Sequence, residues 1–309
     1  MASPMTDPGH EVPPNTVFET EFELDPKAGS TLSKTIRHQE REVNRVKITS
    51  DRIRNTSFRA ELAKVQYGTY NCQQADGTYK PEPAALLIFN FRFHFRSENR
   101  DRFTSVKIEV EFKETLNTKL ERPPDRNPNN DPQVRFVAPH QICGTPTEVD
   151  VKKSWKFEGQ LGYQVPAGPS LSATPSVQTE ASFQRHHRMW IKGDTDGDND
   201  HRWDNKAVWV MQENRMQGSG VLSSFPGAVV IVLPKSPEHL VKARVTVVPH
   251  LAFSLNPLRL KQKRDDPILL DRKTSWGPEY EPGKDFSDPD YPWSSIIKIP
   301  TEYQDILHT

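Results

Sequence analysis

The most regular pattern of hydrophobic and polar positions lies in the first half of the chain. From Phe89 to Phe95 every second residue is phenylalanine, and from Val106 to Phe112 apolar residues alternate with charged ones. A period of two puts alternate residues on one face of a β-strand, so each segment is predicted to be a strand with one buried face. The polar residues 96–102 fit a short connection between them. The segments 86–95 and 106–112 are therefore predicted to pair as an antiparallel hairpin.

Shorter segments of the same character cover most of the chain. Residues 18–24 alternate with glutamate, which indicates an edge strand, and residues 227–233 are continuously apolar, as in a strand buried on both faces. Residues 32–62 fit helical and strand spacing, and the pattern leaves them open. Further strands are predicted at residues 134–138, 147–165, 176–192, 205–213 and 241–248. Such a series of short strands indicates a sandwich or an open barrel, and the prediction is all-β, an antiparallel β-sandwich.

A second alternating region, residues 151–187, has two interpretations. Apolar or small residues occupy the odd positions from Trp155 to Val165, and the alternation resumes after a turn sequence at residues 166–169. Two alternating segments of about ten residues around a turn are typical of a membrane β-hairpin. A hairpin lying on the core of a water-soluble sandwich has the same alternation. The sandwich hairpin is the prediction, because a period of two shows only that one face is buried.

Composition indicates that the two ends of the chain lie outside the predicted sandwich. The chain of 309 residues contains 27 prolines and only 34% hydrophobic residues, whereas the usual share of proline is about 5%. Proline returns and periodicity fades from Asn256 onward. The predicted organisation is a disordered N-terminus at residues 1–15, a β-sandwich domain at residues 16–255 and an extended proline-rich tail at residues 256–309.

Charge narrows the class of partner. Lys+Arg and Asp+Glu both total 41, so the net charge is zero, which argues against a dedicated nucleic-acid partner. Basic residues gather between Arg37 and Arg54, but Glu40, Glu42 and Asp51 are interleaved with them, which favours a solvated, salt-bridged face. A protein partner or self-association is expected instead. A membrane partner is expected only if residues 151–187 form a membrane β-hairpin.

Cysteine content and hydropathy indicate the compartment. Two cysteines, Cys72 and Cys143, are too few for a disulfide scaffold. The first residues lack the pattern of a secretory signal, and no apolar run approaches the roughly 20 residues of a membrane helix. The sequence therefore predicts a cytoplasmic protein with both thiols reduced.

One segment, residues 186–204, is rich in groups that bind metals. Asp194, Asp196 and Asp198 alternate like the start of a calcium loop, but Asn199 stands where such a loop needs glycine. The preferred interpretation is a solvated hairpin tip, since Asp-Gly forms tight turns. The alternative is a site for calcium or a transition metal, with the candidate ligands His187, Asp194, Asp196, Asp198 and His201. No catalytic motif or cofactor-binding fingerprint occurs elsewhere in the sequence.

Four motifs follow one another along the chain: Phe89-Asn-Phe-Arg-Phe93, Arg102-Phe-Thr-Ser-Val-Lys-Ile-Glu-Val-Glu-Phe112, Pro132-Gln-Val-Arg-Phe-Val-Ala-Pro139 and Trp209-Val-Met-Gln-Glu-Asn214. Their order resembles that in a family of uncharacterised β-rich proteins from filamentous fungi. The resemblance covers residues 85–250, and its motifs have the character of core strands. It implies a β-rich fold and no particular activity.

The sequence predicts a non-catalytic binding or assembly module, because no nucleophile, base and orienting group converge in any motif. A first alternative is a pore-forming or membrane-active protein that uses the hairpin at residues 151–187. A second is a metal-dependent enzyme built on the His/Asp-rich segment 186–204.

Overall fold

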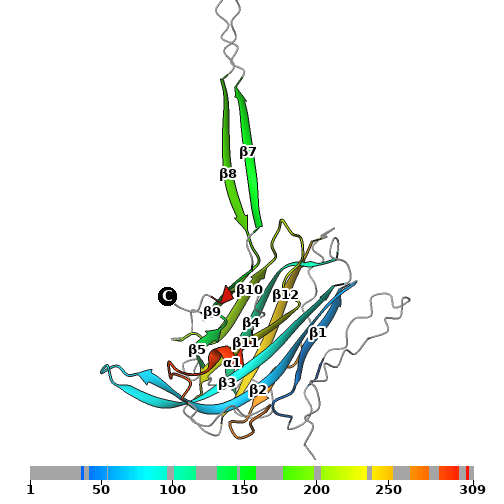
Figure 1. The fold of residues 1–309 in the computed structure, drawn as a ribbon. Helices are drawn as coiled ribbons and strands as arrows, with labels where there is room; N and C mark the ends of the chain where they lie inside the picture. The colour runs from blue at the N-terminus through cyan, green and yellow to red at the C-terminus, as the bar shows by residue number, and fades with distance from the viewer. Residues whose placement is uncertain are drawn as a thin grey trace, which may run out of the picture. The chain divides into compact units, whose positions relative to one another are not determined.

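Long strands with one buried face make up most of the structure, which is a computed structural model (Figure 1). It describes residues 36–37, 42–53, 55–95, 101–115, 131–144, 147–157, 177–197, 203–234, 239–252, 265–277, 285–298 and 304–305. These residues all belong to one compact unit, Leu32–Thr309. The predicted edge strand at residues 18–24 lies outside the described residues.

The first sheet has five strands in the order β1-β2-β3-β11-β5. Their bounds are β1 Lys47–Ile53, β2 Thr56–Gln73, β3 Tyr79–Phe95, β11 Ser224–Val232 and β5 Gln133–Ala138. The segment left open at residues 32–62 therefore contains β1 and the start of β2. Strand β11 is buried on both faces from Gly227 to Val232, as its continuous apolar run predicts.

The second sheet has seven strands in the order β13-β12-β4-β10-β9-β6-β14. Their bounds are β13 Ile268–Leu270, β12 Leu240–Leu251, β4 Phe103–Thr115, β10 Lys206–Gln212, β9 Trp190–Asp196, β6 Gln141–Cys143 and β14 Gln304–Asp305. Every strand pair in both sheets is antiparallel. The two sheets pack together, so the predicted antiparallel β-sandwich is confirmed.

The hairpin predicted at residues 86–95 and 106–112 is wrong in its pairing. Strand β3 pairs with β2 and β11, whereas β4 pairs with β10 and β12 in the other sheet. The two strands meet across the core instead, where the rings of Phe93 and Phe103 lie 5.7 Å apart, edge to face. Alternation reports a buried face, and both inner faces of a sandwich satisfy it equally well.

The core between the sheets is centred on aromatic rings. Phe91 has no exposed surface and stacks on Phe89 and Phe225 with centroids 6.1 and 5.9 Å apart. Trp209 of β10, also fully buried, contacts Phe91 and Phe225 from the opposite sheet at 5.9 and 5.8 Å. Burying rings of this size contributes a large share of the hydrophobic stabilisation.

One segment of the C-terminal tail, residues 285–297, packs on the outer face of the five-stranded sheet, whereas β13 and β14 of the tail belong to the seven-stranded sheet. Phe286, Ile296 and Ile297 form a second apolar cluster with Ala84, Leu86 and Ile88 of β3. The single helical turn α1 (Trp293–Ile296) belongs to this segment, and Trp293 stacks on Phe136 at 4.3 Å. We call residues 285–297 the strap.

Candidate functional site

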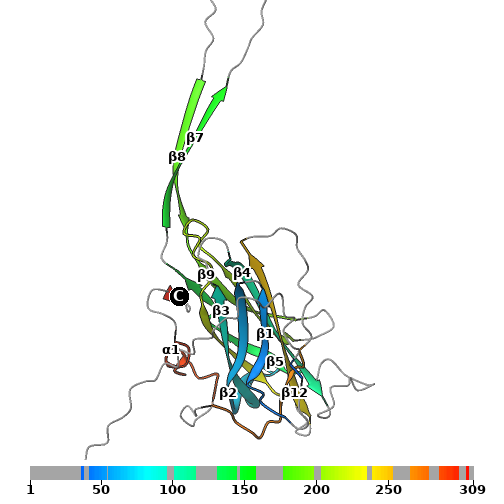
Figure 2. The same ribbon diagram turned by 90° about the vertical axis from the view of Figure 1, so that its right-hand side faces the viewer.

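The hairpin formed by β7 (Thr147–Phe157) and β8 (Val177–His187) is a two-stranded sheet of its own. Eleven consecutive residues pair in register without a shift, from Thr147 opposite His187 to Phe157 opposite Val177. Figure 1 and Figure 2 show the two strands paired with each other alone. β7 and β8 therefore join neither large sheet, and the expectation that this hairpin lies on the core of the sandwich stays a prediction.

The pairing is symmetric about position 167, midway between the partners Phe157 and Val177. That position lies inside the turn predicted from Pro166 to Pro169, although residues 158–176 are outside the described part of the chain. Cross-strand partners in an antiparallel pair lie on the same face. The register therefore places the odd positions of both strands on one face and the even positions on the other.

The root of this hairpin continues the pairing of β6 with β9, but with a change of register. Cys143 lies opposite Trp190 at the end of β6, and the amide of Gly144 donates to the carbonyl of Met189 at 2.9 Å. Three residues then lead to Thr147, whereas only two residues separate Trp190 from His187. The root of the hairpin therefore joins two strand pairs whose registers differ by one residue.

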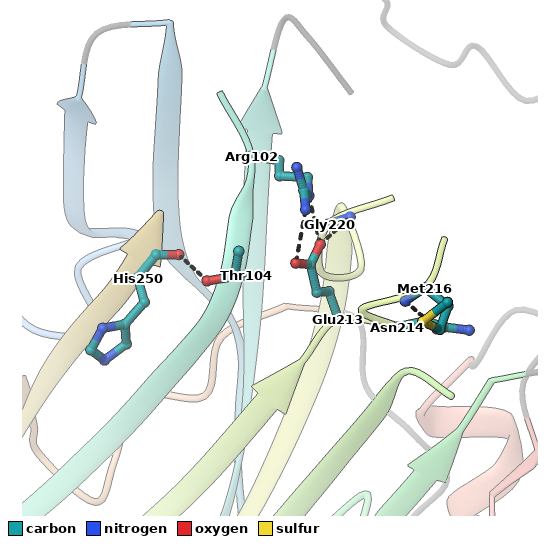
Figure 3. Close-up of polar contacts among 7 residues, drawn as sticks. All are labelled: Arg102, Thr104, Glu213, Asn214, Met216, Gly220 and His250. Atoms are coloured by element: carbon teal, nitrogen blue, oxygen red, sulfur yellow. Dashed lines mark hydrogen bonds and ion pairs between the residues drawn. The ribbon is translucent and has the colours of Figure 1, made fainter. Parts of the chain in front are cut away.

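Asn214, directly after β10, binds both strands at this root. Its side-chain Nδ2 donates to Thr147 Oγ1 at 2.8 Å and to the His187 carbonyl at 3.0 Å. Its Oδ1 accepts from the amide of Met216 at 3.1 Å (Figure 3). Asn214 is only 1% exposed. Both amide hydrogens thus bind one paired position of β7 and β8, which fixes where the hairpin begins.

An ion pair next to Asn214 fixes the loop that carries it. Glu213 Oε2 accepts from Arg102 Nε at 2.7 Å and from the amide of Gly220 at 3.0 Å (Figure 3). The Glu213 side chain is 4% exposed, so removal of either partner would leave an uncompensated charge in a poorly solvated position. Gly220 has φ +82°, a conformation that L side chains rarely adopt. The pair closes the loop from residue 213 to residue 220 and holds Asn214 against the root.

These root residues were not identified as functional by sequence reasoning. Trp209, Glu213 and Asn214 belong to one motif, which the sequence presents as a core strand. Of these three residues, only Trp209 packs in the core between the sheets. Glu213 and Asn214 follow the end of β10, and two polar residues directly after a strand of alternating character are the signal that could have separated them.

The structure separates one candidate metal ligand, His187, from two others, Asp194 and Asp196. His187 is at the hairpin root, whereas Asp194 and Asp196 are near the opposite end of β9. At about 3.3 Å per residue, Asp194 is roughly 13 Å along the strand from Trp190. Asp194 and Asp196 accept hydrogen bonds from the amides of the residues that follow them, at 2.9 Å each.

Asp198 and His201 lie outside the described residues. Among those described, no group of three or more His, Cys, Asp or Glu side chains could hold a metal ion. The pairing of β9 with β10 agrees with a hairpin at this segment. A metal site formed by the full set of five residues stays a prediction.

Comparison with known proteins does not assign this chain to a family. No family model matches the chain, and no curated protein matches it in sequence. A crystal structure of the Clostridium perfringens NetB toxin in its membrane-inserted form aligns with 69% of this chain and 93% of its own length, at 8% identity and a TM-score of 0.22. At that TM-score the similarity supports no conclusion about this chain. Within the described residues, no helix is long and apolar enough to span a membrane.

Proposed function

We propose that this protein is a non-catalytic, membrane-active assembly protein in which β7–β8 hairpins of several copies pair into a β-barrel. The observation that carries the proposal is the two-stranded sheet itself: eleven residue pairs in register, outside both sheets of the sandwich. Assembly through this hairpin unites the self-association expected from the sequence with the membrane alternative.

A lone two-stranded sheet needs a partner on physical grounds. An isolated hairpin is at best marginally stable in water. Its outer edges present unpaired amides and carbonyls, which are templates for another strand. The same hairpin from a second copy offers a matching edge of equal length. In a bilayer the only strand arrangement that satisfies every backbone group is a closed barrel, to which each copy would add two strands.

The residue pattern along the hairpin suits a barrel wall. Every even position is polar, from Glu148 to Lys156 and from Gln178 to His186. Apolar residues are found only at odd positions: Val149, Val151, Trp155, Phe157, Val177, Ala181 and Phe183. Strands of about 9–11 residues cross a bilayer when tilted, and the sequence alternates over the eleven residues from Trp155 to Val165. The odd face would contact lipid and the even face would line the lumen.

Two basic residues on the odd face set the depth of insertion. Lys153 and Arg185 share that face with the apolar positions. A basic residue facing lipid costs about 2–4 kcal/mol at the midplane but about 0–1 near the interface. Both residues lie on the root side of Trp155. The proposal therefore places the root-side part of the hairpin at the headgroups and the part beyond Trp155 in the hydrocarbon.

Neighbouring cysteine variants beyond Trp155, Val177→Cys and Gln178→Cys, test this arrangement. Each is labelled with an environment-sensitive dye and mixed with liposomes that contain a trapped fluorophore. Both native thiols are buried, and burial raises the pKa of the Cys72 thiol, so they react slowly with the label. We expect the dye at position 177 to report an apolar environment and quenching by lipid-attached quenchers, the dye at position 178 to remain in water, and the trapped fluorophore to leak.

Equal responses at positions 177 and 178, or intact liposomes at every protein concentration, would reject the barrel. A detergent-resistant oligomer that forms without lipid and leaves liposomes intact would retain assembly and reject only its membrane role.

A further inference from the structure

The outer face of the five-stranded sheet is divided into two unlike halves along β3. Ala84, Leu86 and Ile88 point to this face and are buried under the strap. Beyond Asn90 on the same face, Arg92 and His94 are exposed. The strap therefore covers the apolar half of the face and leaves the basic half open.

The open half is a compact array of hydrogen-bond donors spread over four strands. One cross-strand row contains Ser50, Arg59, Arg92 and Ser224, and the adjacent row contains Arg52, Ser57 and His94. Neighbouring strands are about 4.8 Å apart. Three guanidinium groups, one imidazole and three hydroxyls thus start from adjacent positions. We call these seven residues the arginine grid.

Two arginines of the grid lie directly opposite each other on neighbouring strands. Arg59 and Arg92 are cross-strand partners, and like charges in that position destabilise a sheet. Glu61 approaches Arg59 at 3.5 Å. Arg59 and Arg92 beside this glutamate leave a locally positive site on a chain whose net charge is zero. A bound anion would offset the repulsion between Arg59 and Arg92.

The grid lies at the same end of the sandwich as the hairpin root. The amide of Phe93 donates to the Ser223 carbonyl at 2.7 Å, and the amide of Val221 donates to the Phe103 carbonyl at 3.0 Å. The amide of Glu213 then donates to the Thr104 carbonyl at 2.9 Å, and Asn214 holds the root. A continuous series of hydrogen-bonded segments therefore joins the grid strand to the hairpin.

We infer that the arginine grid docks the protein on anionic lipid headgroups before the hairpin inserts, an inference that rests on the proposed function. Guanidinium groups match phosphate and carboxylate groups with paired N–H donors, and serine hydroxyls supply further donors. The negative surface of an anionic membrane attracts exposed basic residues over about a Debye length. Docking through the grid would bring the root end of the sandwich, and with it the hairpin, to the bilayer.

The test measures vesicle binding by flotation, separately from leakage. Vesicles of phosphatidylcholine alone are compared with vesicles in which part of it is replaced by phosphatidylserine, for the full chain and for the double variant Arg59→Gln/Arg92→Gln. Binding to the anionic vesicles should weaken about fivefold for each arginine removed, or ~30-fold for the pair. Added salt should weaken the wild type more than the double variant.

A matched control removes two exposed basic residues from the other sheet, Lys107→Gln/Arg244→Gln. This control should bind anionic vesicles nearly as well as the wild type, and Arg92→Lys should retain most of the binding. Melting temperatures exclude misfolding as the cause of any loss. Equal losses in both double variants, or no preference for phosphatidylserine, would overturn the inference.

The remaining outcomes separate the two proposals. Vesicle binding that depends on the arginine grid but causes no leakage would support docking through the grid and reject the barrel. Leakage that is unchanged in Arg59→Gln/Arg92→Gln would reject docking through the grid alone. Binding to duplex DNA that depends on Arg59 and Arg92, with no preference for phosphatidylserine vesicles, would assign the surface to nucleic acid and overturn the lipid inference.

Discussion

Trp209 occupies its central position because two glycines make room for its indole ring. A Cβ atom built on Gly227, in the opposite sheet, would lie 2.9 Å from Trp209 Cζ2. A Cβ on Gly193, in the neighbouring strand, would lie 2.9 Å from Cδ1 and 2.4 Å from the Pro139 carbonyl oxygen. Real Cβ atoms do not approach so closely, and a packed interior transmits such an overlap to its neighbours. The absence of a side chain at Gly227 therefore sets how closely the two sheets approach.

Gly227→Ala should lower the free energy of unfolding by about 1–3 kcal/mol, because one added methyl group overfills the space beside Trp209. Chemical denaturation monitored by tryptophan fluorescence measures the change. Ser224→Ala, an exposed position on the same strand, is the control and should change stability by less than about 0.5 kcal/mol. An unchanged midpoint for Gly227→Ala would show that the sheets can separate there without cost.

At the scale of elements, the hairpin root depends on one side chain. Asn214 provides both hydrogen bonds to Thr147 and His187, and it is too buried for water to replace them readily. A buried acceptor that loses its donor costs about 1–3 kcal/mol. This loss of free energy concerns the contacts of the root, because the buried aromatic core consists of other residues.

Asn214→Ala should therefore loosen the hairpin root and leave the sandwich folded. The amide of Gly144, which bonds to Met189 across the root, should exchange with deuterium about 5- to 150-fold faster, whereas amides of β4 should keep their protection. Thr147→Ser preserves the hydroxyl acceptor and should behave as the wild type. Arg215→Ala, an exposed neighbour, controls for general effects on the loop. Unchanged exchange at Gly144 would mean that the root keeps its hydrogen bonds without Asn214.

The sequence predicts the elements far better than their pairing. Alternation located β3, β4, β10 and β12 because a half-buried strand needs a period of two. It could not show that β3 and β4 belong to different sheets, since the alternation is identical on either side of a sandwich. The alternation of residues 151–187 was also visible, but the sequence does not record whether the buried face meets the protein, another copy or lipid. The contacts of Asn214 were not predictable, because they join two strands distant from it in sequence.

At the scale of the whole molecule, the strap divides the outer face of the five-stranded sheet. The amide of Phe286 donates to the Thr69 carbonyl at 2.9 Å, and Asn71 Nδ2 donates to Asp285 Oδ2 at 2.6 Å. The strap thus extends pairing at the far end of β2 while its aromatic and aliphatic side chains cover the apolar half of the face. This cluster is separate from the core between the sheets. The apolar half and the arginine grid can therefore be altered independently.

Ile296→Asp should release the strap without unfolding the sandwich, because a carboxylate cannot be buried against Leu86 and Val230 without a partner. Exposed apolar surface on the sheet should then increase the fluorescence of a hydrophobic dye, and a protease should cut the strap faster. Lys298→Asp, an exposed position just beyond the strap, introduces the same group as a control. Because the arginine grid lies on the other half of the face, binding to phosphatidylserine vesicles should persist when the strap is released. Loss of that binding in Ile296→Asp, with the sandwich still folded, would show that the strap and the grid form a single surface.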